Sequence, residues 1–236
     1  CGADIVTHAT TKYMDGHGSA VGGCIVDSGR FEWTKYPAKF PGLCTPDDSY
    51  HGIVYAEKFG LEGAFITKAT AQLMRDFGCT QSPQSAFLLG LGLESLHVRM
   101  ERHCSNALAL AKFLKNHPKV SWVNYPGLSD SPQYPLVQKY LKGASGVLCF
   151  GVKGGSAAGE RVMNALKIAA IVVHVADVRT CVLHPASMTH RQLSEKELLA
   201  AGVSPDLIRL SVGIEDADDL IEDIRQAIEM AEKGNA

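Results

Sequence analysis

Residues 8–18, HATTKYMDGHG, set the first constraint on the fold, because they place a single lysine, Lys12, directly after a strand-like run. A lysine amine held there can form an imine with a carbonyl cofactor if its surroundings keep part of it unprotonated. Thr10 and Thr11 could donate hydroxyl hydrogen bonds to a phosphate, and Gly16 and Gly18 allow backbone to approach a ligand closely. On spacing alone, a solvated turn lysine remains the commoner alternative.

Composition limits the class of protein. The 236 residues are 46% hydrophobic, enough for one large domain or two modest ones. The 23 basic and 25 acidic residues give a net charge of -2 without long Lys/Arg runs, so we expect no nucleic-acid or membrane partner. The seven cysteines are unpaired in spacing and mostly apolar in surroundings, which indicates reduced thiols in a cytoplasmic protein.

The first half of the sequence predicts two strands, a long excursion and a long helix. Strands are expected at 4–9 and 22–27, and an ordered, non-periodic excursion at 31–63. The apolar spacing of AFITKATAQLMRDFG predicts a helix that stops at Gly78. Ser82 then caps a helix that could run over 83–116, interrupted softly by two glycines, Gly90 and Gly92. We interpret RMERH, 99–103, as a solvated face of this helix.

The second half predicts a small α/β layer of three strands with helices between them. KVSWVNYPGL supplies a preceding strand and turn. Three helix starts carry capping signals, at Ser156, at Ser194 with Glu197, and at Asp216. The three strands are expected in GVLCFGV, in AIVVHVAD (170–177) and in IRLSVG (208–213).

Two further groups of residues carry possible chemistry. Arg209 lies in an apolar strand, where its charge needs either a protein carboxylate, such as Glu215 or Asp216, or the carboxylate of a ligand. From the residues alone, the internal pair is favoured. Cys181, His184 and His190 are metal-ligand types, but a fourth ligand and a tight motif are missing, so no metal site is expected. We expect His184 to orient its loop instead.

Three segments together carry a resemblance: HATTKYMDGHG, LHPASMTH (183–190) and IRLSVGIED (208–216). The chain resembles the Cys/Met-metabolism family of pyridoxal-phosphate enzymes, which have the α/β, aspartate-aminotransferase-like fold of type I. Within the family it is most similar to the O-acetylhomoserine sulfhydrylases. The resemblance covers essentially all 236 residues. It implies that residues 1–100 are the remainder of a large cofactor-binding domain, and 101–236 a connecting helix with an α+β C-terminal small domain.

The resemblance also implies roles for individual residues. Lys12 would be the Schiff-base lysine of pyridoxal 5'-phosphate, and Thr11, with Thr10, would contact the phosphate. Arg209 would bind the substrate α-carboxylate, with His174 beside it. The implied reaction, in methionine biosynthesis, replaces the acetate of O-acetylhomoserine with sulfide or a thiol, giving homocysteine or methionine. Like subunits would form a homotetramer. A cystathionine γ-synthase or methionine γ-lyase type enzyme, or an inactive truncated remnant serving as an oligomerising module, are the alternatives.

Departures from the family pattern qualify these implications. Ala9 stands where the family usually has Ser, His174 where it has a small or amide residue, and Ala176 where it has Gly. The family's acidic partner of the pyridine nitrogen, its stacking aromatic ring and its Tyr and Arg from the neighbouring subunit would all precede Cys1. We therefore expect the chain to be the C-terminal part of a longer enzyme, and by itself to bind the cofactor weakly and be inactive.

Overall fold

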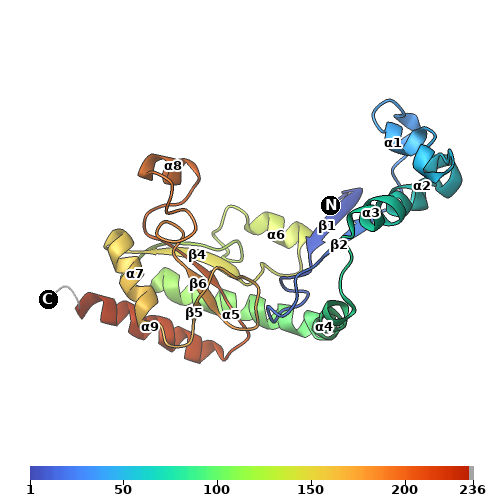
Figure 1. The fold of residues 1–236 in the computed structure, drawn as a ribbon. Coiled ribbons are helices and arrows are strands. Elements are labelled where there is room, and N and C mark those ends of the chain that lie inside the picture. Colours follow the sequence, from blue (N-terminus) through green and yellow to red (C-terminus); the bar gives the residue numbers. More distant parts are fainter. Residues whose placement is uncertain (234–236) are drawn as a thin grey trace. The chain divides into compact units, whose positions relative to one another are not determined.

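The computed structural model describes residues 1–233, drawn in Figure 1. The chain forms two compact units. Unit 1 comprises residues 1–10 and 21–88, and unit 2 comprises residues 11–20 and the chain from 89 onward. The loop that carries Lys12 therefore belongs to unit 2, although it connects two strands of unit 1. The division into a large domain up to residue 100 and a small domain after it stays a prediction.

Unit 1 begins with the two expected strands. β1 (Ile5–Ala9) and β2 (Gly23–Asp27) pair antiparallel as a hairpin. Its other elements surround a small aromatic core formed by Trp33, Leu43, Tyr55, Ala56 and Ala64. These elements include the short helices η1 (Trp33–Lys35), α1 (Pro41–Cys44) and η2 (Asp48–Tyr50).

The helix that was expected to end at Gly78 does end there, but it begins earlier than predicted. α2 (Tyr55–Lys68) continues into η3 (Ala69–Met74) and α3 (Arg75–Phe77), and Gly78 closes it in the left-handed conformation. The start at Tyr55 lies inside the predicted non-periodic excursion. Gly60, with φ +65, kinks α2, so the apolar spacing shifts there and hides the first turns from a periodicity search.

The single helix predicted over 83–116 is two helices. α4 (Pro83–Glu94) and α5 (Leu96–Asn116) are separated at Ser95, whose ψ of 1° is not helical. The predicted cap is present, because the Ser85 amide donates to Ser82 Oγ at 3.1 Å. The prediction of a soft interruption at the glycines was wrong about the position of the break.

The central feature of unit 2 is a five-stranded mixed sheet of order β3-β4-β7-β6-β5. β3, β4 and β7 were expected. The strand predicted at 170–177 is reduced to two residues, and β6 was not anticipated. The strands are β3 (Val120–Asn124), β4 (Val147–Val152), β5 (Ala170–Ile171), β6 (Cys181–Leu183) and β7 (Leu207–Ser211).

Helices flank this sheet, and two of the three predicted caps are present. The Ser194–Glu197 capping box opens α8 (Glu195–Ala200). Asp216 accepts from the Asp218 amide at 2.9 Å at the start of α9 (Ala217–Lys233), whose predicted last residue, Gly234, lies outside the described residues. Ser156 is not a cap: α7 (Gly155–Ala165) starts after Gly154, which has φ +105. A short helix, α6 (Tyr134–Tyr140), completes the unit.

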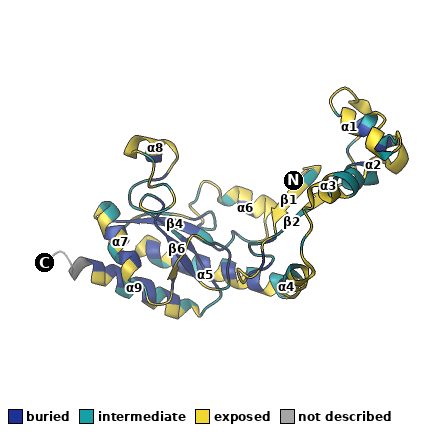
Figure 2. Cartoon of the chain, viewed as in Figure 1, coloured by how far each residue is buried: buried dark blue, intermediate teal, exposed yellow. Residues whose placement is uncertain are grey.

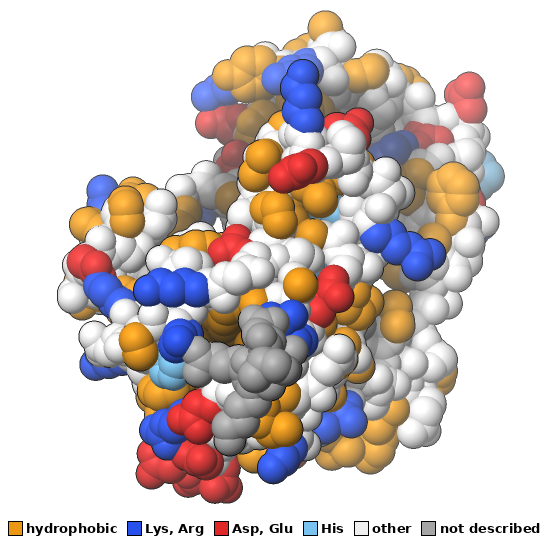
Figure 3. Space-filling model, turned by 90° about the vertical axis from the view of Figure 1, so that its left-hand side faces the viewer, with side chains coloured by type: hydrophobic (Ala, Val, Ile, Leu, Met, Phe, Trp, Pro, Cys, Tyr) orange, Lys and Arg blue, Asp and Glu red, His pale blue; other side chains and the backbone are white. Residues whose placement is uncertain are grey.

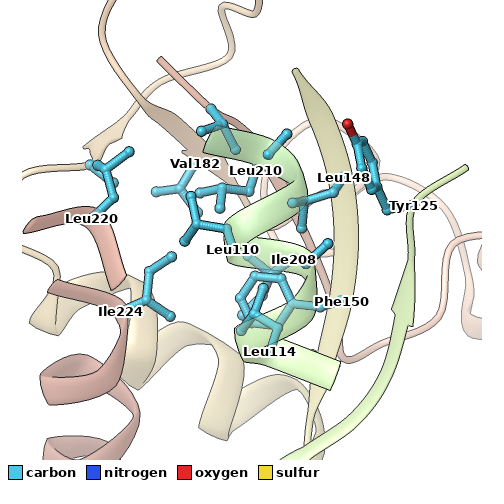
Figure 4. Close-up of a cluster of buried hydrophobic side chains, with 14 of the residues drawn as sticks. Leu110, Leu114, Tyr125, Leu148, Phe150, Val182, Ile208, Leu210, Leu220 and Ile224 are labelled. Carbon is cyan, nitrogen blue, oxygen red and sulfur yellow. The ribbon is translucent and has the colours of Figure 1, made fainter. Parts of the chain in front are cut away.

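The main core lies between one face of the sheet and helices α5, α7 and α9 (Figure 4). Because successive strand residues point to opposite faces, Ile208 and Leu210 of β7 enter this core, whereas Arg209 and Ser211 face the other way. Figure 2 shows that the strands of this sheet are largely buried, whereas helices α5, α7 and α9 have both buried and exposed residues. On the face drawn in Figure 3, basic and acidic side chains are interspersed. Among residues 1–233, no helix is long and apolar enough to span a membrane.

One glycine of α4 is required by packing, which gives a testable contrast with its neighbour. A Cβ on Gly92 would lie 2.5 Å from the carbonyl oxygens of Met14 and Asp15, whereas a Cβ on Gly90 would meet nothing within 4 Å. We expect Gly92→Ala to lower the free energy of unfolding by about 2 kcal/mol or more through overpacking, and Gly90→Ala to raise it slightly through helix propensity. Urea denaturation of both variants in the native polypeptide checks this, and equal effects would contradict it.

Candidate active site

The loop containing Lys12 is ordered by its own hydrogen bonds. The Gly16 amide donates to the Lys12 carbonyl at 2.8 Å. The buried Asp15 carboxylate accepts from Ser19 Oγ at 2.6 Å and from the Ser19 amide at 2.9 Å. Burial acts to raise the pKa of Asp15, but these hydrogen bonds outweigh it and the pKa lies below its ordinary value. Asp15 therefore remains a carboxylate that fixes the turn after the lysine.

Arg99 of α5 lies beneath the same loop. Its guanidinium donates to Gly92 O at 2.7 Å and to Ser95 Oγ at 3.0 Å, and it is buried. A Cβ on Gly16, which has φ +76, would lie 2.3 Å from Arg99 Nη1. Only glycine fits that position without displacing the guanidinium. The interpretation of 99–103 as a solvated face was thus wrong for Arg99.

His103, one turn further along α5, is also buried and anchors the residue after the lysine. The Tyr13 and His103 rings meet edge to face at 5.1 Å between centroids. The Gly146 amide donates to the Tyr13 hydroxyl at 3.0 Å, and His103 Nδ1 lies 2.7 Å from Val212 O. Burial lowers the pKa of His103, which favours a neutral ring donating to that carbonyl. The Lys12 loop is therefore held against both α5 and the ends of β4 and β7.

A second segment, residues 172–180, leaves the sheet edge and approaches the lysine loop. The Ala176 amide donates to Ser211 Oγ at 2.7 Å, and the Val178 amide donates to Gly16 O at 2.8 Å. Ala176 has φ +65, a conformation that favours glycine. A glycine would adopt this conformation without the strain that the Ala176 Cβ introduces. The turn at Ala176 also explains why the predicted strand is short, since the backbone turns away after Val172.

This segment brings His174 to Lys12. Lys12 Nζ lies 3.4 Å from His174 Nδ1, and the other ring nitrogen lies 3.8 Å from Asp177 Oδ2. Asp177 is fully buried, and Arg179 binds it through two 3.0 Å hydrogen bonds, one to each oxygen. Burial acts to raise the pKa of Asp177, but the bonds from Arg179 outweigh it and the pKa is lowered. The result is a row of amine, imidazole, carboxylate and guanidinium.

Arg209 lies on the sheet face opposite the helices, and no carboxylate among residues 1–233 pairs with it. Its Nη2 donates to Val173 O at 2.8 Å, and its buried Nε has no hydrogen-bond partner within residues 1–233. Burial lowers its pKa. The internal ion pair favoured from the residues is wrong in the described part of the chain, because Glu215 accepts from the Thr180 amide and hydroxyl, at 2.6 and 2.9 Å. The Arg209 Nε is therefore a buried donor left without an acceptor among the described residues.

The structure brings together three of the five residues singled out from the sequence. Lys12 touches His174, and Arg209 binds the carbonyl of the residue before His174. Thr11 precedes Lys12 in unit 2, and Thr10 is buried at the end of the unit 1 hairpin. His184 orients its loop as expected, through Ser187 Oγ and Pro205 O, each at 2.8 Å. In residues 1–233, no three His, Cys, Asp or Glu side chains are grouped to hold a metal.

Sequence reasoning missed the roles of Arg99, Asp177 and Arg179. The available signals were weak. Arg99 lies on a helix where charges are usually solvated. The i, i+2 spacing of Asp177 and Arg179 within a strand-like run could have indicated a pair on one side of the chain.

An α/β unit that presents a half-buried lysine is compatible with imine formation on a carbonyl cofactor. The model of the family "Cys/Met metabolism PLP-dependent enzyme" matches residues 1–229. The chain belongs to this family, and its cofactor class is therefore pyridoxal phosphate, as the resemblance implied.

Similar proteins are named for sulfur amino-acid synthesis. A homocysteine synthase of Schizosaccharomyces pombe is 50% identical over 231 residues, covering 98% of this chain and 54% of that protein. An O-acetyl-L-homoserine sulfhydrylase of Thermus thermophilus is 46% identical over 228 residues, covering 96% and 53%. The chain thus spans about half the length of the curated relatives it matches.

A solved structure is similar in fold as well. It is described as an O-acetylhomoserine (thiol)-lyase of Campylobacter jejuni carrying N'-pyridoxyl-lysine-5'-monophosphate, with a TM-score of 0.86 and 37% identity. The match covers 97% of this chain and 54% of that one. The type I fold predicted from the resemblance is confirmed, as a partial domain.

Proposed function

We propose that the chain is the lysine-bearing part of an enzyme that replaces the acetate of O-acetyl-L-homoserine with sulfide or a thiol, giving homocysteine or methionine. The observation that carries this is the placing of the Lys12 amine, 3.4 Å from His174, in the same unit as an Arg209 that has no acidic partner among residues 1–233. Relatives named homocysteine synthase and O-acetyl-L-homoserine sulfhydrylase support the substrate class. The whole protein is proposed to act in the cytoplasm as a homotetramer.

The residues present fit the cofactor. Lys12 supplies a primary amine for its carbonyl carbon, and Thr11 and Thr10 supply hydroxyls next to that amine in sequence for its phosphate. Pyridoxal phosphate, when bound, supplies an electron sink that stabilises negative charge at the substrate α-carbon.

The chain's own groups perform binding and proton transfer. Arg209 would bind the substrate α-carboxylate through its fork of N–H donors, since its Nε is otherwise left without an acceptor. Val173 O already fixes the other end of the fork at 2.8 Å, so the guanidinium is oriented before substrate arrives. The Lys12 amine, once free, can accept the α-proton and return it.

The substrate assignment is tested by assaying the whole protein separately with O-acetylhomoserine plus sulfide, with cystathionine and with methionine. O-Acetylhomoserine with sulfide should be converted to homocysteine at least about tenfold faster than cystathionine or methionine alone is consumed. Faster consumption of methionine or cystathionine would instead support a γ-lyase or γ-synthase type enzyme. No turnover of any of the three would favour the inactive oligomerising module, for which the departures at Ala9 and His174 are the motivating observation.

A further inference from the structure

Two side chains of β7 bind the backbone of residues 173–176. Arg209 and Ser211 alternate with the core residues of the strand and therefore lie on the same face of the sheet, opposite the main core. Arg209 Nη2 donates to Val173 O at 2.8 Å, and Ser211 Oγ accepts from the Ala176 amide at 2.7 Å. The segment is thus hydrogen-bonded to β7 at both of its ends.

The same segment is the one that reaches the lysine loop. It contains His174, whose Nδ1 lies 3.4 Å from Lys12 Nζ. Shortly after it, the Val178 amide donates to Gly16 O at 2.8 Å. A change in the backbone of residues 173–176 would therefore reach both the lysine loop and the carbonyl at the start of the segment.

The Ser211 hydrogen bond holds a conformation that the segment would not otherwise keep. Ala176 has φ +65, a left-handed conformation that is unfavourable for a residue with a Cβ. The amide that Ser211 binds belongs to this same residue, and Ser211 is 1% exposed, so water has little access to the bond. Without that acceptor, we expect Ala176 to return mostly to negative φ and the backbone on either side of it to shift.

We propose that Ser211 is a positioning residue. Through the Ala176 amide it keeps residues 173–176 in the conformation in which Val173 O orients the Arg209 guanidinium for a substrate carboxylate. The inference rests on the proposed function, in which Arg209 binds that carboxylate. A residue that acts in this way changes the KM of the amino-acid substrate more than it changes kcat.

The first test is kinetic and uses the whole protein with pyridoxal phosphate. Ser211→Ala should raise the KM for O-acetylhomoserine about tenfold and leave kcat within about threefold, because substrate binding is weakened while Lys12 is kept. Ser211→Thr retains the hydroxyl oxygen and should restore the native KM. Ser204→Ala removes a hydroxyl of the same unit that has no hydrogen-bond partner among residues 1–233, and this control should leave KM unchanged.

A second substitution distinguishes positioning from general destabilisation. Ala176→Gly allows positive φ without a steric cost, so the segment should keep its shape better when the Ser211 hydroxyl is lost. We expect Ser211→Ala in the Ala176→Gly background to raise KM only about twofold, because the two sites are coupled. An equally large increase in both backgrounds, or an unchanged KM in Ser211→Ala alone, would overturn the proposal.

Hydrogen exchange gives a measurement that does not depend on turnover. The Val178 amide, which is bound to Gly16 O, should exchange at least about tenfold faster in Ser211→Ala and close to the native rate when Ala176→Gly is added. Unchanged exchange of this amide in Ser211→Ala would also overturn the proposal. If the exchange rates changed as expected but the native protein converted no O-acetylhomoserine, the proposed function would fail, while the role of Ser211 in holding the segment would stand.

Discussion

Replacement of Lys12 by alanine is expected to reduce kcat in the native polypeptide by at least about 10³-fold and to abolish covalent trapping of the cofactor. Lys12 is the primary amine that the loop ordered by Asp15 presents to His174. Its removal takes away both the covalent attachment and the proton carrier, and two functions lost at one atom are not recovered by neighbouring side chains.

The measurement combines turnover with chemical mapping. Borohydride reduction of the protein with bound pyridoxal phosphate, followed by peptide mass spectrometry, should place the pyridoxyl label on the peptide that contains Lys12. Lys196→Ala, an exposed lysine of α8, serves as the control and should keep both turnover and label. A label on another peptide, or turnover of Lys12→Ala within tenfold of the native value, would contradict the assignment.

Local signals in the sequence were sufficient where the structure is determined locally. The Ser194–Glu197 capping box, the cap at Ser82 and the left-handed stop at Gly78 all lie where predicted. Each depends on hydrogen bonds or backbone conformations within four residues, although the equally local cap predicted at Ser156 is absent. The apolar segments of β4 and β7 were also predicted as strands, and both contribute residues to the core.

Where contacts between distant segments decide the structure, the sequence could not give it. The break at Ser95 and the burial of Arg99 depend on the loop of Met14 and Asp15, about 80 residues earlier, approaching Gly92. The apolar run at 170–177 has strand composition, but its later residues are drawn off the sheet by the bond from Ala176 to Ser211. Periodicity does not report such contacts.

The site was read from the sequence only in part, and the reason is chemical. The resemblance pointed to Lys12, Arg209 and His174, whereas spacing alone left the lysine as a solvated charge and paired the arginine internally. The internal pairing failed because Glu215 has nearer donors at Thr180. Asp177 and Arg179 lay unnoticed because a carboxylate's partner depends on how the chain folds back, and the turn at Ala176 decides that.

The second large effect is expected at Arg209. Arg209→Leu should lower kcat/KM for the amino-acid substrate by about 10²–10³-fold, mainly through KM, because a carboxylate left without its buried charged partner costs about 2–5 kcal/mol. Arg209→Lys keeps the charge but loses the planar fork of N–H donors. Its kcat/KM should therefore lie between that of the native protein and that of Arg209→Leu. The native protein already has an unsatisfied, buried Arg209 Nε. The free energy of unfolding of Arg209→Leu should therefore be no lower than that of the native protein.

That stability measurement separates binding from folding. Arg225→Leu, an arginine of α9 whose partner Glu222 is on the surface, is the matched control and should leave kcat/KM within twofold. If Arg209→Leu kept kcat/KM while Arg225→Leu lowered it, the carboxylate would be bound elsewhere. If Arg209→Leu lost activity only in proportion to a lost Tm, the guanidinium would be a structural group holding the Val173 carbonyl. Because Arg209 Nη2 is bound to Val173 O and Nε has no partner among residues 1–233, we expect neither outcome.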